Sequence, residues 1–133
     1  MRHFRTAATF TAIVLSPAIA GAASWQPATA TTVHAGVTSS SKFVIAAYVT
    51  LPDQCYVARI RTSTSVLRRL FVVEQMPGSS TCNGKTAYNC TVVSSAFNLP
   101  ISHQFGVVSK GKTWEVTLAA KAPNPLPPMC AKP

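Results

Sequence analysis

The sequence predicts an all-β protein, an antiparallel β-sandwich of about seven strands that is held by disulfides. Short runs rich in Val, Ile, Thr, Phe and Tyr recur between clusters of turn-forming residues, roughly every 8–12 residues. No run has the apolar period of an amphipathic helix. The length of 133 residues suits one domain, and four cysteines accompany it. A small β-barrel is the alternative architecture.

The composition excludes several classes of protein. Hydrophobic residues make up 47% of the chain and charged residues 11%, whereas a disordered chain is poor in apolar residues and rich in charge. A coiled coil is excluded because Ala, Glu, Lys, Leu and Arg do not dominate. The acidic residues are only three, Asp53, Glu74 and Glu115, so catalysis by a pair of carboxylates is nearly excluded.

Residues 1–23 are predicted to be a secretory signal peptide. Residues 1–5 carry positive charge, residues 7–19 are apolar, and small residues follow up to Ala23. The apolar stretch is too short to cross a bilayer, which requires about 20 apolar residues, and no later segment is long enough. We therefore expect export to the periplasm or the extracellular space, with no transmembrane segment after cleavage.

Cleavage would leave a single domain, residues 24–121, and a proline-rich tail, residues 122–133. The net charge falls from +9 to +7 because Arg2 and Arg5 are removed. An even number of cysteines in an exported chain predicts disulfides. We expect the tail to be extended and polyproline-like, and Cys130 to pin it to the domain. Its P-x-x-P pattern is interpreted as a stiff spacer rather than as a ligand for an aromatic groove.

The strand pattern begins weakly and then sharpens. A weak strand is predicted at residues 30–34. Residues 43–51 form a nearly continuous apolar run with β-branched and aromatic residues, which predicts a strand buried on both faces. Residues 55–61 alternate between apolar and basic side chains, so a half-exposed strand is expected there. Residues 62–65 are predicted to turn.

Four further strands are predicted in the second half of the chain. An apolar run at residues 66–74 is interrupted by two arginines, and residues 91–97 form the next candidate. Residues 104–108 and 113–118 flank a short turn. The second of these is the cleanest half-buried strand, with Trp114 among the side chains that alternate toward the core.

Two local patterns are similar to those of immunoglobulin-like domains. Residues 51–56, LPDQCY, end a buried strand and open an alternating one, and Cys90 opens a later strand. Residues 108–116, VSKGKTWEV, are similar to the L-x-x-G-x-x-Y-x-V stretch of immunoglobulin-like and fibronectin-type domains, with Trp114 in place of the tyrosine that forms a corner bond. Over about residues 43–118 the chain resembles small exported bacterial immunoglobulin-like domains with a P-x-x-C-Y motif, most of which have no assigned activity.

The resemblance implies a pairing of the cysteines. Cys55 would pair with Cys90 and bridge two strands, and Cys82 would pair with Cys130 and tie a loop to the tail. Four cysteines allow three pairings, and the sequence alone does not choose among them. The main alternative joins Cys82 to Cys90 across a short loop and Cys55 to Cys130.

No residue is singled out as catalytic, as a metal ligand or as a cofactor ligand. The mature chain would retain only His34, His103 and Asp53 for a triad, and it has no G-x-S-x-G motif. Disulfide-bonded cysteines are not nucleophiles, and Cys82 and Cys90 have no neighbouring histidine that would suggest zinc. Glycine-rich nucleotide motifs are absent, and Asp53 is interpreted as a turn former. We therefore expect no enzyme activity, no cofactor and no nucleotide.

The excess of positive charge favours anionic partners. Arg59 and Arg61 share one face of a predicted strand, and Lys110 and Lys112 flank one predicted turn. These four side chains are candidate contacts for an anionic component of the cell envelope, such as lipopolysaccharide or an acidic glycan. The simpler interpretation is that the charge maintains solubility.

The predicted function is that of a non-enzymatic exported accessory or binding module, whose partner is an unknown protein or an anionic envelope component. Loops on a rigid scaffold usually carry recognition. The candidate loop here contains Pro77, Gly78, Asn83, Lys85 and Tyr88. One alternative is a secreted protease inhibitor that presents this loop in a preorganised form. Another is a basic binder of envelope polyanions, whose affinity would fall steeply with salt.

Overall fold

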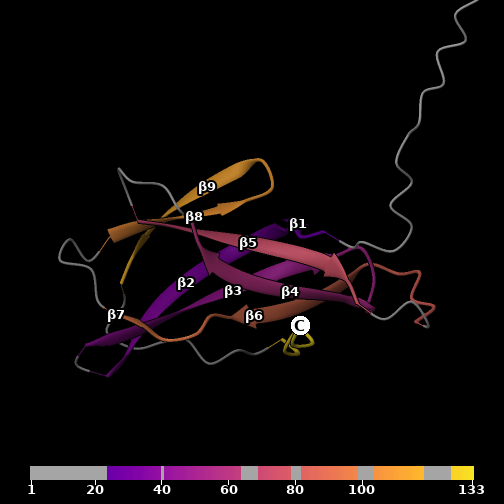
Figure 1. Cartoon of the computed structure of the whole chain (residues 1–133), viewed down its shortest axis with the longest axis horizontal. Coiled ribbons are helices and arrows are strands. Elements are labelled where there is room, and N and C mark those ends of the chain that lie inside the picture. The colour runs from indigo at the N-terminus through magenta and orange to yellow at the C-terminus, as the bar shows by residue number, and fades with distance from the viewer. Residues whose placement is uncertain (1–23, 40, 64–68, 79–81, 99–103, 119–126) are drawn as a thin grey trace, which may run out of the picture.

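The computed structural model describes the chain from Ser24 onward with five internal gaps (Figure 1). The predicted signal peptide, His103, and parts of the predicted turn at 62–65, of the run at 66–74 and of the tail lie outside the described residues. The described ranges are 24–39, 41–63, 69–78, 82–98, 104–118 and 127–133.

The described part of the chain is all-β and contains no helix, as predicted. Seven of its nine strands have six residues or more, in agreement with the expected number, and the weak strand predicted at 30–34 extends over eleven residues. The strands are β1 (Gln26–Pro27), β2 (Thr29–Ser39), β3 (Lys42–Leu51), β4 (Tyr56–Thr62), β5 (Leu70–Pro77), β6 (Tyr88–Val93), β7 (Phe97–Asn98), β8 (Gln104–Ser109) and β9 (Lys112–Thr117).

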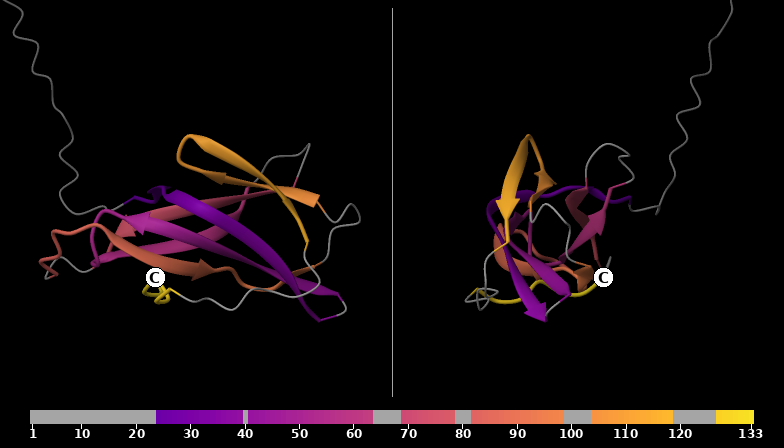
Figure 2. Two further views of the ribbon diagram at one scale, coloured as in Figure 1. Left: turned by 180° about the vertical axis from the view of Figure 1, so that it is seen from behind. Right: turned by 90° about the vertical axis from the view of Figure 1, so that its left-hand side faces the viewer.

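The strands form two sheets that face each other as a sandwich (Figure 2). In the first sheet β5 pairs with β4 along one side and with β1 and β8 along the other, and β9 follows β8. In the second, β3 pairs with β2 on one side and with β6 and β7 on the other. All pairs are antiparallel except β5 with β8, which is parallel. This departure from the expected antiparallel sandwich is possible because β6 and β7, which lie between β5 and β8 in sequence, belong to the other sheet, so β5 and β8 are joined by a long crossover and not by a hairpin.

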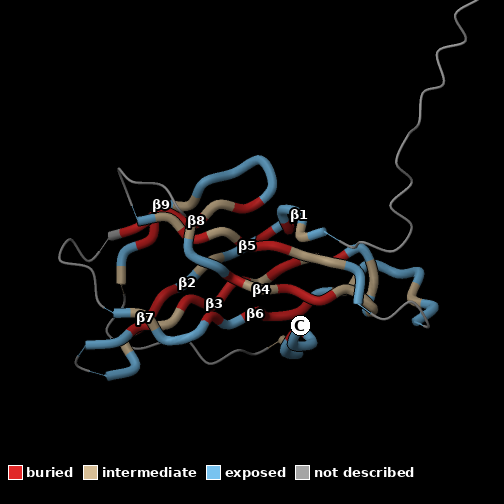
Figure 3. The backbone as a smooth tube through the Cα atoms, viewed as in Figure 1, coloured by how far each residue is buried: buried red, intermediate tan, exposed pale blue. Residues whose placement is uncertain are grey.

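Aromatic side chains fill the space between the sheets. Phe43, Phe71 and Phe105 are fully or almost fully buried, and Phe97 packs against them. The ring centroids of Phe43 and Phe105 are 5.0 Å apart, and those of Phe71 and Phe97 are 4.7 Å apart. Figure 3 shows the buried backbone concentrated in the strands that face this space. Such tilted and edge-on aromatic pairs stabilise the core beyond the contribution of the apolar area that they bury.

The central strand β3 is buried less completely than predicted. Its inward positions, such as Ile45 and Val49, are fully buried. On the outer face Ala46 is buried, but Val44 and Tyr48 are half-buried. The outer face of the second sheet is therefore partly open to solvent, whereas the sequence predicted burial on both faces.

Ala28 joins the two sheets along one side of the sandwich. Its N–H donates to the carbonyl of Val73 at 2.9 Å, and its own carbonyl accepts from the N–H of Lys110 at 2.8 Å. The side chain of Ala28 is fully buried. Both hydrogen bonds go to the first sheet, and the chain itself passes from β1 through Ala28 into β2 of the second sheet. The neighbouring turn between β8 and β9 contains Gly111 at a φ of +71°, a left-handed conformation that suits glycine.

The cysteines pair differently from both arrangements considered in the sequence. Cys55 is bonded to Cys82, and Cys90 is bonded to Cys130. The pairings of Cys55 with Cys90 and of Cys82 with Cys130 are therefore wrong, and so is the alternative. The reason is positional: Cys90 is fully buried in β6, whereas Cys55 lies in the turn before β4, where the loop after β5 returns.

The first disulfide fixes the loop after β5 against the turn before β4. Gly78 N–H donates to the carbonyl of Cys55 at 2.9 Å, and Gly84 N–H approaches the Cys55 sulfur at 3.1 Å. A Cβ on Gly78 would lie against that carbonyl, so only glycine fits this close approach. Asp53 Oδ1 accepts from the Cys55 N–H at 2.7 Å, which confirms its predicted role as a turn former.

The second disulfide fixes the tail against the outer edge of β6, as predicted for Cys130. Thr91 N–H donates to the carbonyl of Pro128 at 2.8 Å, and Cys130 N–H donates to the carbonyl of Thr91 at 3.0 Å. Met129 thus forms a parallel bridge with Thr91. A short piece of the tail adds to the second sheet beside β6.

The disulfide pairing gives a direct prediction. Mass mapping of the oxidised protein under non-reducing conditions should yield cross-linked peptides that join Cys55 to Cys82 and Cys90 to Cys130. A C90A/C130A double variant should lose about 2–5 kcal/mol of unfolding free energy in chemical denaturation, since the bridge closes a long loop in the unfolded chain. A peptide joining Cys55 to Cys90 would contradict the fold described here.

Candidate functional site

An open groove runs along the side of the sandwich opposite Ala28. There β4, at the edge of the first sheet, lies beside β6, at the edge of the second, and the C-terminal residues lie next to β6 (Figure 1). Among the described residues no backbone pairing joins β4 to β6. The groove has a volume of about 760 Å³, which is within the usual range for ligand sites. Its lining is Ala58, Arg59, Ile60, residues 91–95 and residues 129–133.

The edge of β4 presents unpaired backbone groups to this groove. The hydrogen bond from Ser63 N–H to Leu70 and the bond from Gly78 N–H to Cys55 fix which residues of β4 bond to β5. Odd-numbered residues face β5, because bonded and non-bonded pairs alternate in an antiparallel ladder. The N–H and C=O groups of Ala58 and Ile60 therefore point away from β5. Among the described residues, β5 is the only strand that pairs with β4.

The edge of β6 is occupied only in part. The hydrogen bond from Ser94 N–H to Ile45 shows that even-numbered residues face β3, so Thr91 and Val93 point outward. The tail takes both outward groups of Thr91. Beyond Thr91, no strand pairs with the outward side of Val93 among the described residues. One further residue of this edge is therefore open to the groove.

The groove wall contains exposed apolar side chains and one buried hydroxyl group without a hydrogen-bond partner among the described residues. Val93 and Met129 are the large hydrophobic side chains that are most exposed in the described chain, at 36% and 49%. Both line the groove. Thr91 Oγ1 is buried and has no hydrogen-bond partner among the described residues, although such groups are usually satisfied. An exposed apolar pair beside unpaired backbone groups is typical of an interaction surface rather than of a sealed core.

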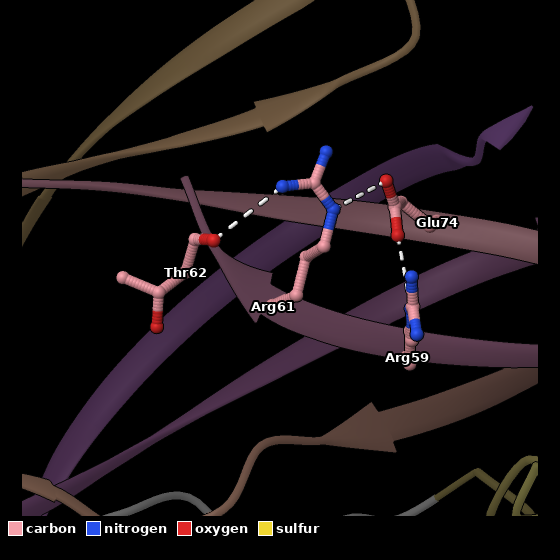
Figure 4. A network of polar contacts seen from close by, with 4 residues as sticks. All are labelled: Arg59, Arg61, Thr62 and Glu74. Atoms are coloured by element: carbon pink, nitrogen blue, oxygen red, sulfur yellow. Dashed lines mark hydrogen bonds and ion pairs between the residues drawn. The ribbon is translucent and has the colours of Figure 1, made fainter. Parts of the chain in front are cut away.

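Two arginines and a glutamate form a network on the outer face of β4 and β5 (Figure 4). Arg59 Nε lies 2.9 Å from Glu74 Oε2, and Arg61 Nε lies 2.6 Å from Glu74 Oε1. Arg59 stands directly opposite Glu74 in the ladder, and Arg61 is the diagonal neighbour on the same face. The Glu74 side chain is only 8% exposed, whereas those of Arg59 and Arg61 are 37% and 44% exposed. The carboxylate is thus covered by the two guanidinium groups.

Trp25 completes this network from the start of the domain. The guanidinium carbon of Arg59 lies 3.9 Å from the centroid of the Trp25 ring, within the range of a cation–π interaction. Arg59 also lines the groove. The sequence analysis assigned no role to Trp25 or Glu74. Trp25 stands alone before the first strand, but Glu74 could have been suspected, because it is one of only three acidic residues and ends a run of apolar ones.

The four predicted polyanion contacts lie on one sheet but in two separate pairs. Arg59 and Arg61 share the charge of Glu74, which reduces their net charge to one. Lys110 and Lys112 lie in the β8–β9 hairpin, and the Lys112 amine is 3.6 Å from the Trp114 ring centroid. Trp114, predicted to lie in the core, is half-buried and packs against it, and its indole N–H donates to Ser109 Oγ at 3.4 Å.

The residues predicted for the recognition loop lie in three different settings. Pro77 ends β5, and Gly78 is bonded to Cys55. Asn83 and Lys85 are exposed. Tyr88 is different, because it begins β6 and packs half-buried against the core, so it belongs to the sheet and not to the loop.

Two of the side chains that were considered for a catalytic triad lie on different elements of the described chain. His34 is exposed on β2, and Asp53 is used in the turn before β4. Within the described ranges no three His, Cys, Asp or Glu residues lie together in a way that could hold a metal ion. The same ranges contain no helix long and apolar enough to span a membrane.

Comparison with known proteins gave no match. No family model, no curated protein and no solved structure is similar to this chain at the level that would count as a match.

The network around Glu74 gives a stability prediction. In chemical denaturation Glu74→Ala should lower the unfolding free energy by about 1–3 kcal/mol, because the nearly buried Glu74 carboxylate is the shared hydrogen-bond partner of both arginines. Arg61→Ala should cost about 1 kcal/mol or less, since Arg61 is well exposed and Glu74 keeps Arg59. Equal losses in the two variants would show that Glu74 is not the centre of the network.

Proposed function

We propose that the chain is a non-enzymatic, exported binding module of the periplasm or extracellular space, and that it binds its partner in the groove between β4 and β6. Export is supported by the leader-like residues 1–23 and by two disulfides, which form and persist in oxidising compartments. The resemblance to small exported immunoglobulin-like domains agrees with such a role and stays a prediction.

One observation carries the proposal. The groove combines the two most exposed large apolar side chains of the described residues, Val93 and Met129, with the unpaired edge of β4. Proteins usually protect such edges by pairing or covering them. A partner that fills the groove would bury the apolar side chains and satisfy the backbone groups together.

The chemistry of the groove lining favours binding over catalysis. Cys130 is held in a disulfide, and Ser94 Oγ is engaged by the N–H of Ile45 at 2.9 Å and the carbonyl of Ser95 at 2.8 Å. The lining residues include no histidine and no acidic side chain. Among the described lining residues, no histidine or carboxylate side chain could therefore serve as the general base that a nucleophile requires within hydrogen-bond reach.

Surface variants test the proposal. Mature, oxidised protein can be immobilised and exposed to envelope extract, with bound proteins identified by mass spectrometry. Val93→Asp and Met129→Asp should each reduce the captured partner roughly tenfold or more, because a carboxylate would be buried in an apolar contact. Thr117→Asp adds the same charge at an exposed position of β9 and should leave capture unchanged.

The salt dependence of capture separates this proposal from the polyanion alternative. A partner that fits the groove by shape should remain bound at high salt. Binding that disappears at high salt and is equally weak in the V93D, M129D and wild-type proteins would instead favour a charge-driven surface around Arg59, Arg61, Lys110 and Lys112. That outcome would overturn the role of the groove.

A secreted protease inhibitor remains a second candidate, and the bridge between Cys55 and Cys82 favours it. This bridge and the hydrogen bond from Gly78 to Cys55 restrain the loop that ends at Tyr88, and restrained loops bind protease clefts well. Stoichiometric inhibition in a panel of serine, cysteine and metalloproteases, lost in the C55A/C82A variant, is the expected result. No inhibition across the panel would remove this candidate.

A further inference from the structure

We infer that the groove takes an extended peptide segment of alternating apolar and acidic residues, which adds as a further strand to the open edge of β4. The inference rests on the proposed binding role of the groove and specifies the class of partner. Four features of the described residues support it.

The first feature is the geometry of the edge. Ala58 and Ile60 each direct an N–H and a C=O group toward the groove, two residues apart on a regular strand. This spacing is the one that a neighbouring strand uses for its hydrogen bonds. In strand addition the backbone hydrogen bonds supply affinity, and the side chains of alternate residues supply specificity.

The second feature is that the molecule already uses this mode of binding on the opposite wall. Residues 128–130 lie along β6 as an extended segment and exchange two backbone hydrogen bonds with Thr91, at 2.8 and 3.0 Å. The bridge is parallel, and it comes from chain far away in sequence. One edge in this groove therefore already carries an added extended segment.

The third feature is the chemistry of the two faces of such a strand. Residues opposite Ala58 and Ile60 would face the inner side of the sheet, near the apolar wall that includes Val93. Residues opposite Arg59 would share the outer face with the partly exposed guanidinium groups of Arg59 and Arg61. Opposite charges at such positions stabilise a pair of strands. A strand with apolar residues on one face and acidic residues on the other would match both the apolar wall and the two arginines.

The fourth feature argues against a second copy of this chain as the occupant. Two copies paired edge to edge through β4 would bring their Arg59 and Arg61 side chains onto one continuous sheet face. Like charges opposite each other destabilise strand pairs. The net charge of +9 for the whole chain, or +7 without residues 1–23, adds long-range repulsion between copies. An acidic segment of a different protein has the complementary charge.

Synthetic peptides test the inference. The probe is a fluorescently labelled peptide of alternating valine and glutamate, titrated with mature, oxidised protein in a fluorescence anisotropy assay. It should bind, and the peptide with lysine in place of glutamate should bind roughly tenfold or more weakly. Arg61→Ala should weaken binding of the glutamate peptide, whereas Lys112→Ala, which removes a charge from the β8–β9 hairpin, should not.

Peptides with N-methylated backbone amides test whether the peptide binds by adding as a strand to β4. Two versions of the peptide carry N-methyl groups either on the valine amides or on the glutamate amides. One version should lose roughly tenfold or more in affinity, because only one set of amides can face β4. Loss with methylated valine indicates an antiparallel strand, and loss with methylated glutamate indicates a parallel one. Equal binding of both versions would overturn the inference.

The two proposals fail in different ways. If the glutamate peptide does not bind at roughly millimolar concentration, while V93D still abolishes capture from envelope extract, strand addition is wrong and the groove remains the binding site. If V93D and M129D both capture the partner as the wild type does, the proposed function is wrong as well.

Discussion

Burial of the inner faces of the two sheets against each other is the interaction on which the rest of the structure depends. Phe43, Phe71 and Phe105 come from different strands of both sheets and meet in one cluster. Because side chains hold the sheets together here, the two edges need not pair with each other. On one side the chain passes at Ala28 from β1 of the first sheet into β2 of the second, and on the other side no backbone pairing joins β4 to β6 among the described residues. The groove is thus a consequence of how the sandwich closes.

The two disulfides and the charge network then shape the surface around this groove. The bridge to Cys130 holds the tail on β6 and so builds one wall. Glu74 holds the side chains of Arg59 and Arg61 together next to β4, which forms the other wall. The Trp25 ring stacks on the Arg59 guanidinium group. A basic chain could carry its charge anywhere, but here two cations are held at the edge that is open. This placement is the reason for proposing an acidic partner.

Much of the fold follows from local pattern. The alternation at residues 113–118, the apolar run at 43–51 and the turn at Asp53 depend on near neighbours in sequence, so they could be predicted. The cysteine pairing could not, because it depends on which strands meet in space. The groove was missed for the same reason: an unpaired edge is visible only when the register of β4 is known. In the sequence, nothing distinguishes Val93 and Met129 from other apolar residues of a strand and a tail.

Amide hydrogen exchange, followed residue by residue by NMR on the oxidised protein without any ligand, tests the central claim most directly. Val57, Arg59 and Arg61 bond to β5, so their amides should exchange slowly. Ala58 and Ile60 lie between them on the same strand but face the groove, so their amides should exchange much faster. Slow exchange at all five positions would mean that the edge of β4 is already paired, and it would contradict both the open groove and the strand addition inferred from it.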